Sequence, residues 1–483
     1  MEPGDAGEGE LKLDVCFLRP LCPAGSDRLQ AREMSFDSPI FLLVLLGSMA
    51  LVRLPAGLAG WGLLAASAVF YAYAGAFDSA LFAAILVANW YASTLVGRSR
   101  LALVLAIAGN VAVLGFFKYR EMLLPNLVTS DFQRVAIPLG ISFYLFHILG
   151  YLIDLRMKRA TLVGPHKFAL FVGFFPHLIA GPIVRARQLM PQLDPLWSGG
   201  TVRRRLALFG VALFLVGLVK KVVFSNSLAP VVDDLFHGVP DDMLLAWAGA
   251  WLFGFQIYFD FSGYTDMALG SAMLLGIRLP INFRTPYLSA DPREFWMRWH
   301  ITLSTWIRDY LYIPLGGSRE GSPWRQMAVL LGVMSLAGLW HGANWTFVVW
   351  GTLWGLYILV CRIFSGALTR VPRWLRWAVH INLVMMLWVF FRAPNVDFAW
   401  AYIARMFSFD FPQTSLVALV TGVAGCAVLM GLHGLESLTL RRHALLVLKR
   451  HASPVLVGTM VGLCLLLLLF PSHDINPFIY FRF

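Results

Sequence analysis

The sequence predicts an all-α, polytopic integral membrane protein. Of its 483 residues, 58% are hydrophobic and 14% are charged, whereas about 25% of the residues of a typical soluble domain are charged. Apolar runs recur along most of the chain, and they lack the strict alternation of a membrane β-barrel. Because a helix needs about 20 apolar residues to cross a bilayer, the runs predict about eleven spanning or partly spanning helices.

The candidate spans are distributed from residue 39 to residue 470. They are 39–55, 56–75, 79–97, 101–117, 135–155, 205–224, 244–259, 327–340, 345–361, 376–391, 414–433 and 454–470. The chain contains no internal repeat, and no polar stretch is long enough for a second, water-soluble domain. Any chemistry is therefore expected at or inside the bilayer.

Residues 1–33 differ from the rest of the chain because they are polar and acidic and contain glycine and proline. They lack the positively charged region followed by an apolar stretch that marks a signal peptide. Met34 begins a segment that leads directly into the first candidate span. We expect residues 1–33 to be a disordered extension, or an upstream start, and residues 34–483 to form one membrane domain.

The formal charge of +12 lies largely in short loops, for example 98–100, 156–159, 203–205 and 448–451. Positive loops favour the cytoplasmic side and attract anionic membrane lipid. No loop forms a large soluble basic domain, so nucleic acid is not an expected partner. The 5 cysteines have neither zinc-like nor disulfide-framework spacing, and we infer no metal site and no bound cofactor.

Carboxylates interrupt the aromatic stretch 256–266, QIYFDFSGYTD, which carries Asp260 and Asp266 with Gly263 between them. An ionisable group inside the membrane is costly, and it is a functional hypothesis by default. Two interpretations remain open. Either the helix breaks here and the acids pair with an arginine elsewhere, or they form a polar wall that lines a substrate cavity.

The stretch 174–187, FFPHLIAGPIVRAR, contains Pro176 and the pair Gly181-Pro182, which exclude a regular helix through it. Irregular backbone at membrane depth is tolerated only where protein buries it or where it lines a cavity. The segment is therefore predicted to be re-entrant. His177, taken alone, is expected to be structural.

Residues 282–317 combine a polar loop with a predicted amphipathic helix. Asp291 can cap this helix and Pro292 suits its first turn, while Pro314 and Gly316-Gly317 end it. On a single helix lying in the membrane interface, polar residues share one face and apolar residues the other. The polar set is Glu294, Arg298, Thr302, Thr305 and Asp309, and the apolar set is Phe295, Trp299, Leu303, Trp306 and Tyr310.

His300 lies at the edge of the apolar arc of this helix, one turn before Ser304. A boundary histidine can be structural. The density of polar residues around His300 favours a functional role, with the imidazole pointing into the membrane.

The stretch GLWHGANW places His341 at a break between two apolar runs. Residues 327–340 form only about 21 Å of helix, against about 30 Å of hydrocarbon, so His341 is predicted to lie inside the membrane. Gly338 and Gly342 remove side-chain bulk around it, and Asn344 adds a polar partner. His341 is either a helix-packing residue or a general base that takes the proton from an attacking hydroxyl.

A set of polar and aromatic residues is predicted to line the site around the two histidines. This set comprises Asp260, Asp266, Ser304, Trp340 and Asn344. The chain contains no G-x-S-x-G, Walker A or dinucleotide-binding motif. Serine hydrolysis, ATP use and nicotinamide chemistry are therefore unsupported.

The segments FFPHLIAGPIVR, YFDFSGYTDMA, EFWMRWHITLSTWIRDYLYIPLGG and GLWHGANWTFVVWG resemble the membrane-bound O-acyltransferase (MBOAT) family from about Met34 onward. Within it they are similar to the bacterial alginate O-acetylase branch, and to the D-alanyl transferase of teichoic acid. The resemblance implies a tunnel or funnel through the bilayer, in which an acyl group passes from a cytoplasmic thioester toward a hydroxyl acceptor outside. It also implies that His341 and His300 are the catalytic histidines.

The resemblance further implies an inner-membrane O-acetyltransferase with acetyl-CoA as the acyl donor. Its partners would be a periplasmic acetyltransferase and a polysaccharide synthesis or export complex. Two other interpretations of the residues remain. One is a transporter in which intramembrane histidine and aspartate residues relay protons, and the other is a structural scaffold of an export complex.

The chain ends PSHDINPFIYFRF, in which Phe478, Tyr480 and Phe483 give the pattern F-x-Y-x-x-F. This tail, residues 478–483, resembles the terminal motif of the small peptide that accompanies D-alanyl transferases. It is either an aromatic anchor at the membrane interface or an acyl relay. In the relay, the Tyr480 phenol oxygen would carry the acetyl group after His341 removes its proton.

Overall fold

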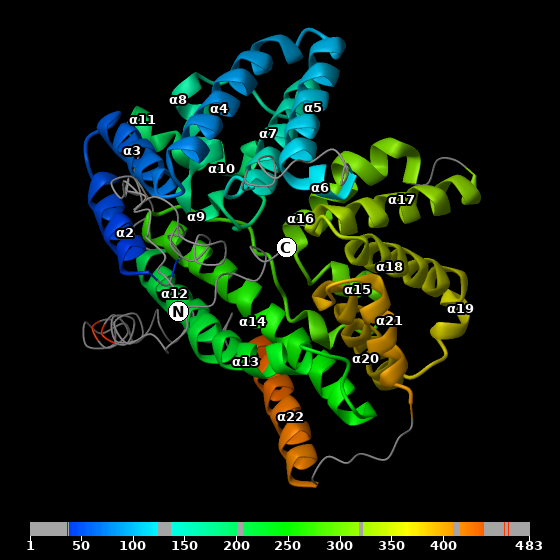
Figure 1. Ribbon diagram of the computed structural model, residues 1–483. Helices are drawn as coiled ribbons and strands as arrows, with labels where there is room; N and C mark the ends of the chain where they lie inside the picture. The colour runs from blue at the N-terminus through cyan, green and yellow to red at the C-terminus, as the bar shows by residue number, and fades with distance from the viewer. Residues whose placement is uncertain are drawn as a thin grey trace, which may run out of the picture.

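The computed structural model describes residues 36, 38–123, 137–199, 206–317, 322–408 and 416–438, together with residues 458 and 462. Within this part of the chain every regular element is a helix and there is no strand, so the all-α prediction is confirmed. Helix α14 (Met243–Leu274) runs through the middle of the molecule. The earlier helices lie on one side of it, and the helices from α15 to α21 lie on the other (Figure 1).

Within the described residues, 6 helical stretches are long and apolar enough to cross a membrane. They are Ala76–Val96 (α4), Arg100–Met122 (α5, η1 and α6), Ala207–Leu235 (α12, η4 and α13), Met243–Leu274 (α14), Trp345–Ile363 (α18) and Arg373–Arg392 (α20). Shorter apolar stretches are Ile40–Leu51, Leu58–Ala72 and Ala424–Glu436. The predicted count of about eleven spans stays a prediction.

The remaining helices connect or flank these spans. Their bounds are α2 (Pro39–Leu51), α3 (Leu58–Ala72), α5 (Arg100–Leu114), η1 (Gly115–Tyr119), α6 (Arg120–Leu123), α7 (Ile141–Arg156), α8 (Pro165–Gly173), α9 (Phe175–Leu178), α10 (Ala186–Leu193), α11 (Pro195–Ser198), α12 (Ala207–Val219), η4 (Lys220–Ser225), α13 (Asn226–Leu235), η5 (Pro286–Leu288), α15 (Pro292–Trp296), α16 (Ile301–Ile307), η6 (Arg308–Gly317), α17 (Pro323–His341), α19 (Ser365–Leu368), α21 (Val396–Arg405) and α22 (Leu416–Leu438). Residues 1–33, 203–205, 448–451 and 454–470 lie outside the described residues.

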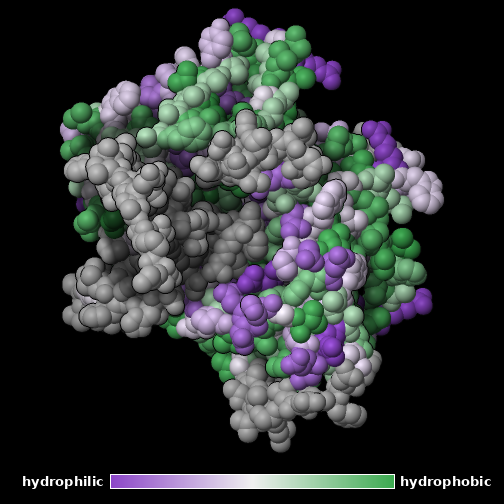
Figure 2. Space-filling view, viewed as in Figure 1, coloured by the Kyte–Doolittle hydropathy of each residue, from purple (hydrophilic) through white to green (hydrophobic). Residues whose placement is uncertain are grey.

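The outer faces of the first helices are apolar, as a lipid-facing surface requires. In α5, Leu101, Val104 and Leu105 are all more than half exposed, and Figure 2 shows apolar side chains over the visible faces of α4 and α5. Between these two helices, Asn89 and Asn110 exchange amide hydrogen bonds of 3.0 and 2.7 Å. The reciprocal bonds satisfy two amides that lipid cannot solvate.

Helix α14 is continuous across Gly263, so the interpretation in which the helix breaks at residues 256–266 is wrong. The glycines serve close packing instead. A Cβ at Gly263 would meet the Gly217 carbonyl oxygen of α12, and a Cβ at Gly270 would meet that of Gly210. Small residues at two levels therefore let the backbones of α12 and α14 approach each other, as in other membrane helix pairs.

Helices α17 and α18 form a similarly close pair just before and after His341. A Cβ at Gly338 would overlap the Phe347 carbonyl oxygen, and a Cβ at Gly342 would overlap the Phe347 ring. The absence of side-chain bulk at these two glycines, which the sequence predicted, is what allows α18 to pack closely beside His341. The consequence is a rigid hairpin that fixes the end of α17.

Candidate active site

The predicted single amphipathic helix from Pro292 to residue 317 is wrong in its middle. The Asp291 side chain accepts from the Glu294 N–H at 2.8 Å and Pro292 lies in the first turn, so the predicted cap is confirmed. However, α15 ends at Trp296, and α16 starts only at Ile301. The chain turns between them, and the predicted polar and apolar faces do not continue through residue 309.

The break is caused by the loop before α15. The Arg284 N–H donates to the Arg298 carbonyl at 2.9 Å, and the Ile301 N–H donates to the Asn282 carbonyl at 2.9 Å. These tertiary bonds replace helical ones. His300, between them, has φ 41° and ψ 52°, the left-handed region that few residues other than glycine occupy. Such strain is typical of functional sites.

His300 is fully buried at the start of α16. Its Nδ1 lies 3.1 Å from Asn282 Oδ1. The Phe261 ring of α14 meets the imidazole edge to face at 4.7 Å between centroids. A tertiary turn, and not a helix face, directs the imidazole of His300 into the protein interior, and its predicted orientation into the membrane stays a prediction.

His341 is the last residue of α17 and is 4% exposed. Its imidazole lies against the rings of Trp340, Trp350 and Phe391, with centroid distances of 4.9, 5.2 and 5.2 Å. The Trp340 ring is also 6.3 Å from the His300 ring. Trp340 therefore contacts both histidines. The structure thus brings together His300 and His341, the two candidate catalytic residues from motifs that are distant in the sequence.

The end of α17 is held by side chains from the helix that continues α5. Lys118 Nζ donates to the carbonyls of Trp340 at 2.5 Å and His341 at 3.1 Å. The Tyr119 hydroxyl donates to the Leu339 carbonyl at 3.1 Å. The last carbonyls of a helix lack helical partners, and a cation there also complements the helix dipole. Sequence reasoning missed both residues, although the lysine in the apolar run GFFKYR was a signal.

The aspartates of α14 form ion pairs with two successive lysines. Lys221 Nζ lies 2.6 Å from Asp260 Oδ1, and Lys220 Nζ lies 2.7 Å from Asp266 Oδ2. The interpretation that paired these acids with an arginine is therefore wrong about the partner, because lysines within the predicted span 205–224 take that role. Whether the aspartates also line a substrate cavity stays a prediction.

The last described helix joins this ion-pair cluster. Glu436 of α22 lies 2.5 Å from Lys220 through Oε1 and accepts from the Tyr258 hydroxyl at 2.6 Å through Oε2. His433, one turn earlier, accepts from the Tyr287 N–H at 3.2 Å through Nε2. Polar contacts therefore attach α22 to α14 and to the loop before α15.

Two of the predicted lining residues have structural contacts of their own. The Ser304 hydroxyl donates to the Trp299 carbonyl at 3.3 Å. Asn344 caps α18 by accepting from the Thr346 N–H at 3.0 Å and donates to the Pro394 carbonyl at 2.8 Å. Asn344 is therefore not the polar partner of His341 that we predicted. Tyr480 and the tail 478–483 lie outside the described residues.

Most of the segment 174–187 is irregular and buried, as predicted, whereas its re-entrant path stays a prediction. The short helix α9 is followed by non-helical residues up to Arg185, and residues 174–184 are all buried. His177 Nε2 donates to the Phe171 carbonyl at 3.0 Å, so its Nδ1 accepts from His147 Nε2 at 3.2 Å. Both ring nitrogens of His177 are engaged, which fits its predicted structural role.

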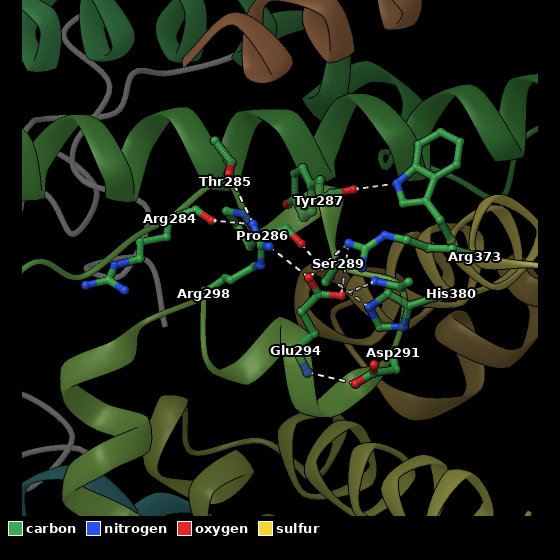
Figure 3. A network of polar contacts seen from close by, with 12 residues as sticks. Arg284, Thr285, Pro286, Tyr287, Ser289, Asp291, Glu294, Arg298, Arg373 and His380 are labelled. Carbon is green, nitrogen blue, oxygen red and sulfur yellow. Dashed lines mark hydrogen bonds and ion pairs between the residues drawn. The ribbon is translucent and has the colours of Figure 1, made fainter. Parts of the chain in front are cut away.

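A polar network at the start of α15 connects that helix to α20 (Figure 3). The Glu294 carboxylate accepts from the Ala290 N–H at 2.8 Å, from Arg298 at 2.8 Å and from Arg373 at 3.1 Å. Burial alone would raise the pKa of Glu294, but these donors and positive charges outweigh burial and hold the pKa below its usual value. The network ties α15 to α20 through the Glu294 carboxylate.

Comparison with known proteins identifies the family. Residues 85–396 match the model of the MBOAT, membrane-bound O-acyltransferase family, and this range contains both histidines. The chain is 41% identical over 396 residues to a probable alginate O-acetylase of Azotobacter vinelandii, covering 78% of this chain and 78% of the relative. It is 36% identical over 382 residues to a peptidoglycan O-acetyltransferase of Helicobacter pylori, covering 70% and 71%.

A more distant relative is a teichoic acid D-alanyltransferase of Streptococcus thermophilus, 30% identical over 239 residues, with 46% of this chain and 56% of the relative covered. The family model and the two O-acetyltransferases extend over most of the described helices. The resemblance drawn from the four sequence motifs is thereby confirmed. The chain belongs to the membrane-bound O-acyltransferase family and is a multi-pass membrane acyltransferase.

Proposed function

We propose that the protein moves an acetyl group from a cytoplasmic thioester across the bacterial inner membrane for O-acetylation of an extracellular or cell-wall polysaccharide. The observation that carries this proposal is a pair of buried histidines from two different motifs. His300 and His341 both contact Trp340. The names of the alginate and peptidoglycan O-acetyltransferases support the acetyl group and the polysaccharide.

In this proposal His341 is the general base. Its imidazole takes the proton from the acceptor hydroxyl as the oxygen attacks the thioester carbonyl. The new C–O bond forms, the C–S bond breaks, and the imidazolium returns the proton to the departing thiolate. The aromatic rings of Trp340, Trp350 and Phe391 exclude water from the imidazole, which protects the thioester from hydrolysis. His300 acts as the second catalytic histidine.

We propose acetyl-CoA as the acyl donor. Its phosphates require positive charge at the cytoplasmic mouth of the site. Arg284, Arg293 and Arg373 are exposed around the loop before α15 and the start of α20. Figure 3 shows the Arg373 guanidinium against Glu294 and the Arg284 side chain extending away from that carboxylate. We propose that this group of arginines binds the phosphates.

The acetyl group would then pass to a periplasmic acetyltransferase that belongs to a polysaccharide synthesis or export complex. Tyr480 is the proposed carrier in this step. Normal transfer by a Tyr480→Phe protein would exclude the carrier role. Loss of transfer in that variant but not in Phe478→Leu would support it.

The test is the base-labile acetate of the cell-envelope polysaccharide in cells with the intact protein, a deletion, His341→Ala and His237→Ala. His237 is an exposed histidine far from the site in sequence and serves as the matched control. Equal loss in the deletion and in His341→Ala, with no loss in His237→Ala, is expected. Retained acetate in His341→Ala would refute His341 as the base.

A second measurement separates transfer from transport. Purified protein is incubated with acetyl-CoA and an acceptor, and release of the free thiol is followed. A proton-coupled transporter or a scaffold releases no thiol, whereas an acyltransferase releases one thiol for each acetyl group transferred. If the wild-type protein released no more thiol than His341→Ala with any acceptor tested, the proposal would be refuted.

A further inference from the structure

We propose that Asn282 is a positioning residue that fixes His300 in one tautomer, with the proton on Nδ1 and the lone pair on Nε2. This inference rests on the proposed function, because it specifies how the second catalytic histidine is prepared for proton transfer. It assigns a role to a residue of the loop before α15 that carries no catalytic group itself.

The first step is the identity of the Asn282 atom that faces His300. That atom lies 3.1 Å from the backbone N of Thr302 and 2.9 Å from the Thr302 hydroxyl. A backbone N–H can only donate, so the facing atom has to be the amide oxygen, Oδ1. The amide orientation is therefore set by the first turn of α16.

The second step is the direction of the Thr302 hydroxyl. The Ile183 N–H donates to Thr302 Oγ1 at 3.0 Å, so the hydrogen of that hydroxyl is directed to Asn282 Oδ1. Ile183 belongs to the irregular stretch after Gly181-Pro182. A chain of donors thus runs from this buried segment through Thr302 to a single oxygen.

The third step concerns the His300 ring. Its Nδ1 lies 3.1 Å from the same oxygen, and an oxygen that only accepts requires a hydrogen on Nδ1. In the neutral imidazole the lone pair is then on Nε2. Among the described residues Nε2 has no hydrogen-bond partner, and the side chain is fully buried. A buried acceptor of this kind is suited to a substrate proton.

The backbone adds a second constraint through the same residue. The Asn282 carbonyl accepts from the Ile301 N–H at 2.9 Å, directly after the left-handed His300. Asn282 thus holds both the strained turn and the imidazole that the turn presents.

The test uses two substitutions of Asn282, one that keeps a side-chain acceptor and one that removes it. Asn282 Nδ2 has no hydrogen-bond partner among the described residues, so Asn282→Asp keeps all three accepted bonds. Asn282→Leu removes them and keeps the branched shape of the side chain. Asn382→Leu, which alters a half-buried amide of α20, is the matched control.

We expect Asn282→Leu to lower kcat by roughly 10²- to 10⁴-fold, since a wrong histidine tautomer has cost about 10⁴-fold in a serine protease. The KM for the thioester should change little. Asn282→Asp should retain kcat within about tenfold of the wild-type value, as should Asn382→Leu. An Asn282→Leu protein with wild-type kcat would overturn the proposal, as would an Asn282→Asp protein that loses kcat to the same extent.

A spectroscopic readout does not depend on activity or on a folded leucine variant. The ¹⁵N signals of histidine in the membrane-embedded wild-type protein distinguish Nδ1–H from Nε2–H, and a His300→Gln sample identifies the signals of His300. We expect Nδ1–H for His300 in the wild-type protein and in Asn282→Asp. An Nε2–H tautomer in the wild-type protein would refute this inference even if His341→Ala abolishes acetylation, so its failure is separate from that of the proposed function.

Discussion

Replacing Lys118 by methionine removes the ammonium group that closes the C-terminal end of α17. The side chain keeps its length and its apolar stem, but the hydrogen bonds to the carbonyls of Trp340 and His341 are lost. A buried acceptor left without a donor costs about 1–3 kcal/mol. Two carbonyls lose their donor, and Lys118 is only half-buried. We therefore expect the summed cost for the two carbonyls to lie near the lower end of this range, at about 2–3 kcal/mol.

These hydrogen bonds stabilise the position of the backbone that carries the His341 imidazole. If the wild-type position of the imidazole is needed in the transition state, a loss of about 2–3 kcal/mol lowers kcat about 30- to 160-fold. Tyr119→Phe loses one neutral hydrogen bond to the Leu339 carbonyl, worth about 0.5–1.5 kcal/mol. Its kcat should therefore fall only about 2- to 13-fold.

The assay is release of thiol from acetyl-CoA by purified protein, with the melting temperature measured on the same samples. Lys118→Arg keeps a cation at the end of α17 and should retain more activity than Lys118→Met. A Lys118→Met protein with wild-type kcat would refute the idea that this contact positions His341. Equal losses in Lys118→Met and in Lys118→Arg would show that charge at this end of the helix is not what matters.

Three further predictions concern stability. Asn89→Leu or Asn110→Leu alone leaves one buried amide without its partner and should destabilise the protein by about 1–3 kcal/mol, whereas the double variant should lose less than the sum in thermal unfolding. The pKa of Glu294 is lowered in the folded protein, so its stabilising contribution is present above the usual pKa near 4.5 and is lost as pH falls through the folded-state pKa. Acid should therefore lower the melting temperature of Glu294→Gln less than that of the wild type. Gly338→Leu should prevent the close packing of α17 on Phe347 of α18, and a yield of folded protein equal to the wild type would contradict this.

The fold class could be predicted from the sequence because helices that face lipid need long apolar runs, which are visible directly in the sequence. Long apolar runs have few structural alternatives, and the histidine of GLWHGANW stands out because an imidazole within such runs is rare. The same argument located His300 in a segment dense in polar residues. These predictions depend on local signals, and local signals are what a single sequence contains.

The missed features depend on contacts between distant parts of the chain. The spacing of Phe295, Trp299 and Leu303 fits a continuous helix, but hydrogen bonds from residues 282–284 break it at His300. Nothing near His341 in the sequence indicates that Lys118 would close its helix. The partners of Asp260 and Asp266 were likewise ambiguous, since opposite charge alone does not distinguish a lysine of η4 from an arginine.

The ion pairs between η4 and α14 also bear on how the chain enters the membrane during synthesis. Each charged side chain near the centre of a spanning helix costs about 2.5–3.5 kcal/mol on insertion, and Lys220, Lys221, Asp260 and Asp266 all lie in such helices. Inserted separately, the two spans would each carry two of these charges into lipid. Paired, they largely neutralise one another. We therefore expect residues 207–274 to leave the translocon as one hairpin, and a ribosome-bound chain that ends before Asp260 to keep its lysine-bearing span outside the bilayer.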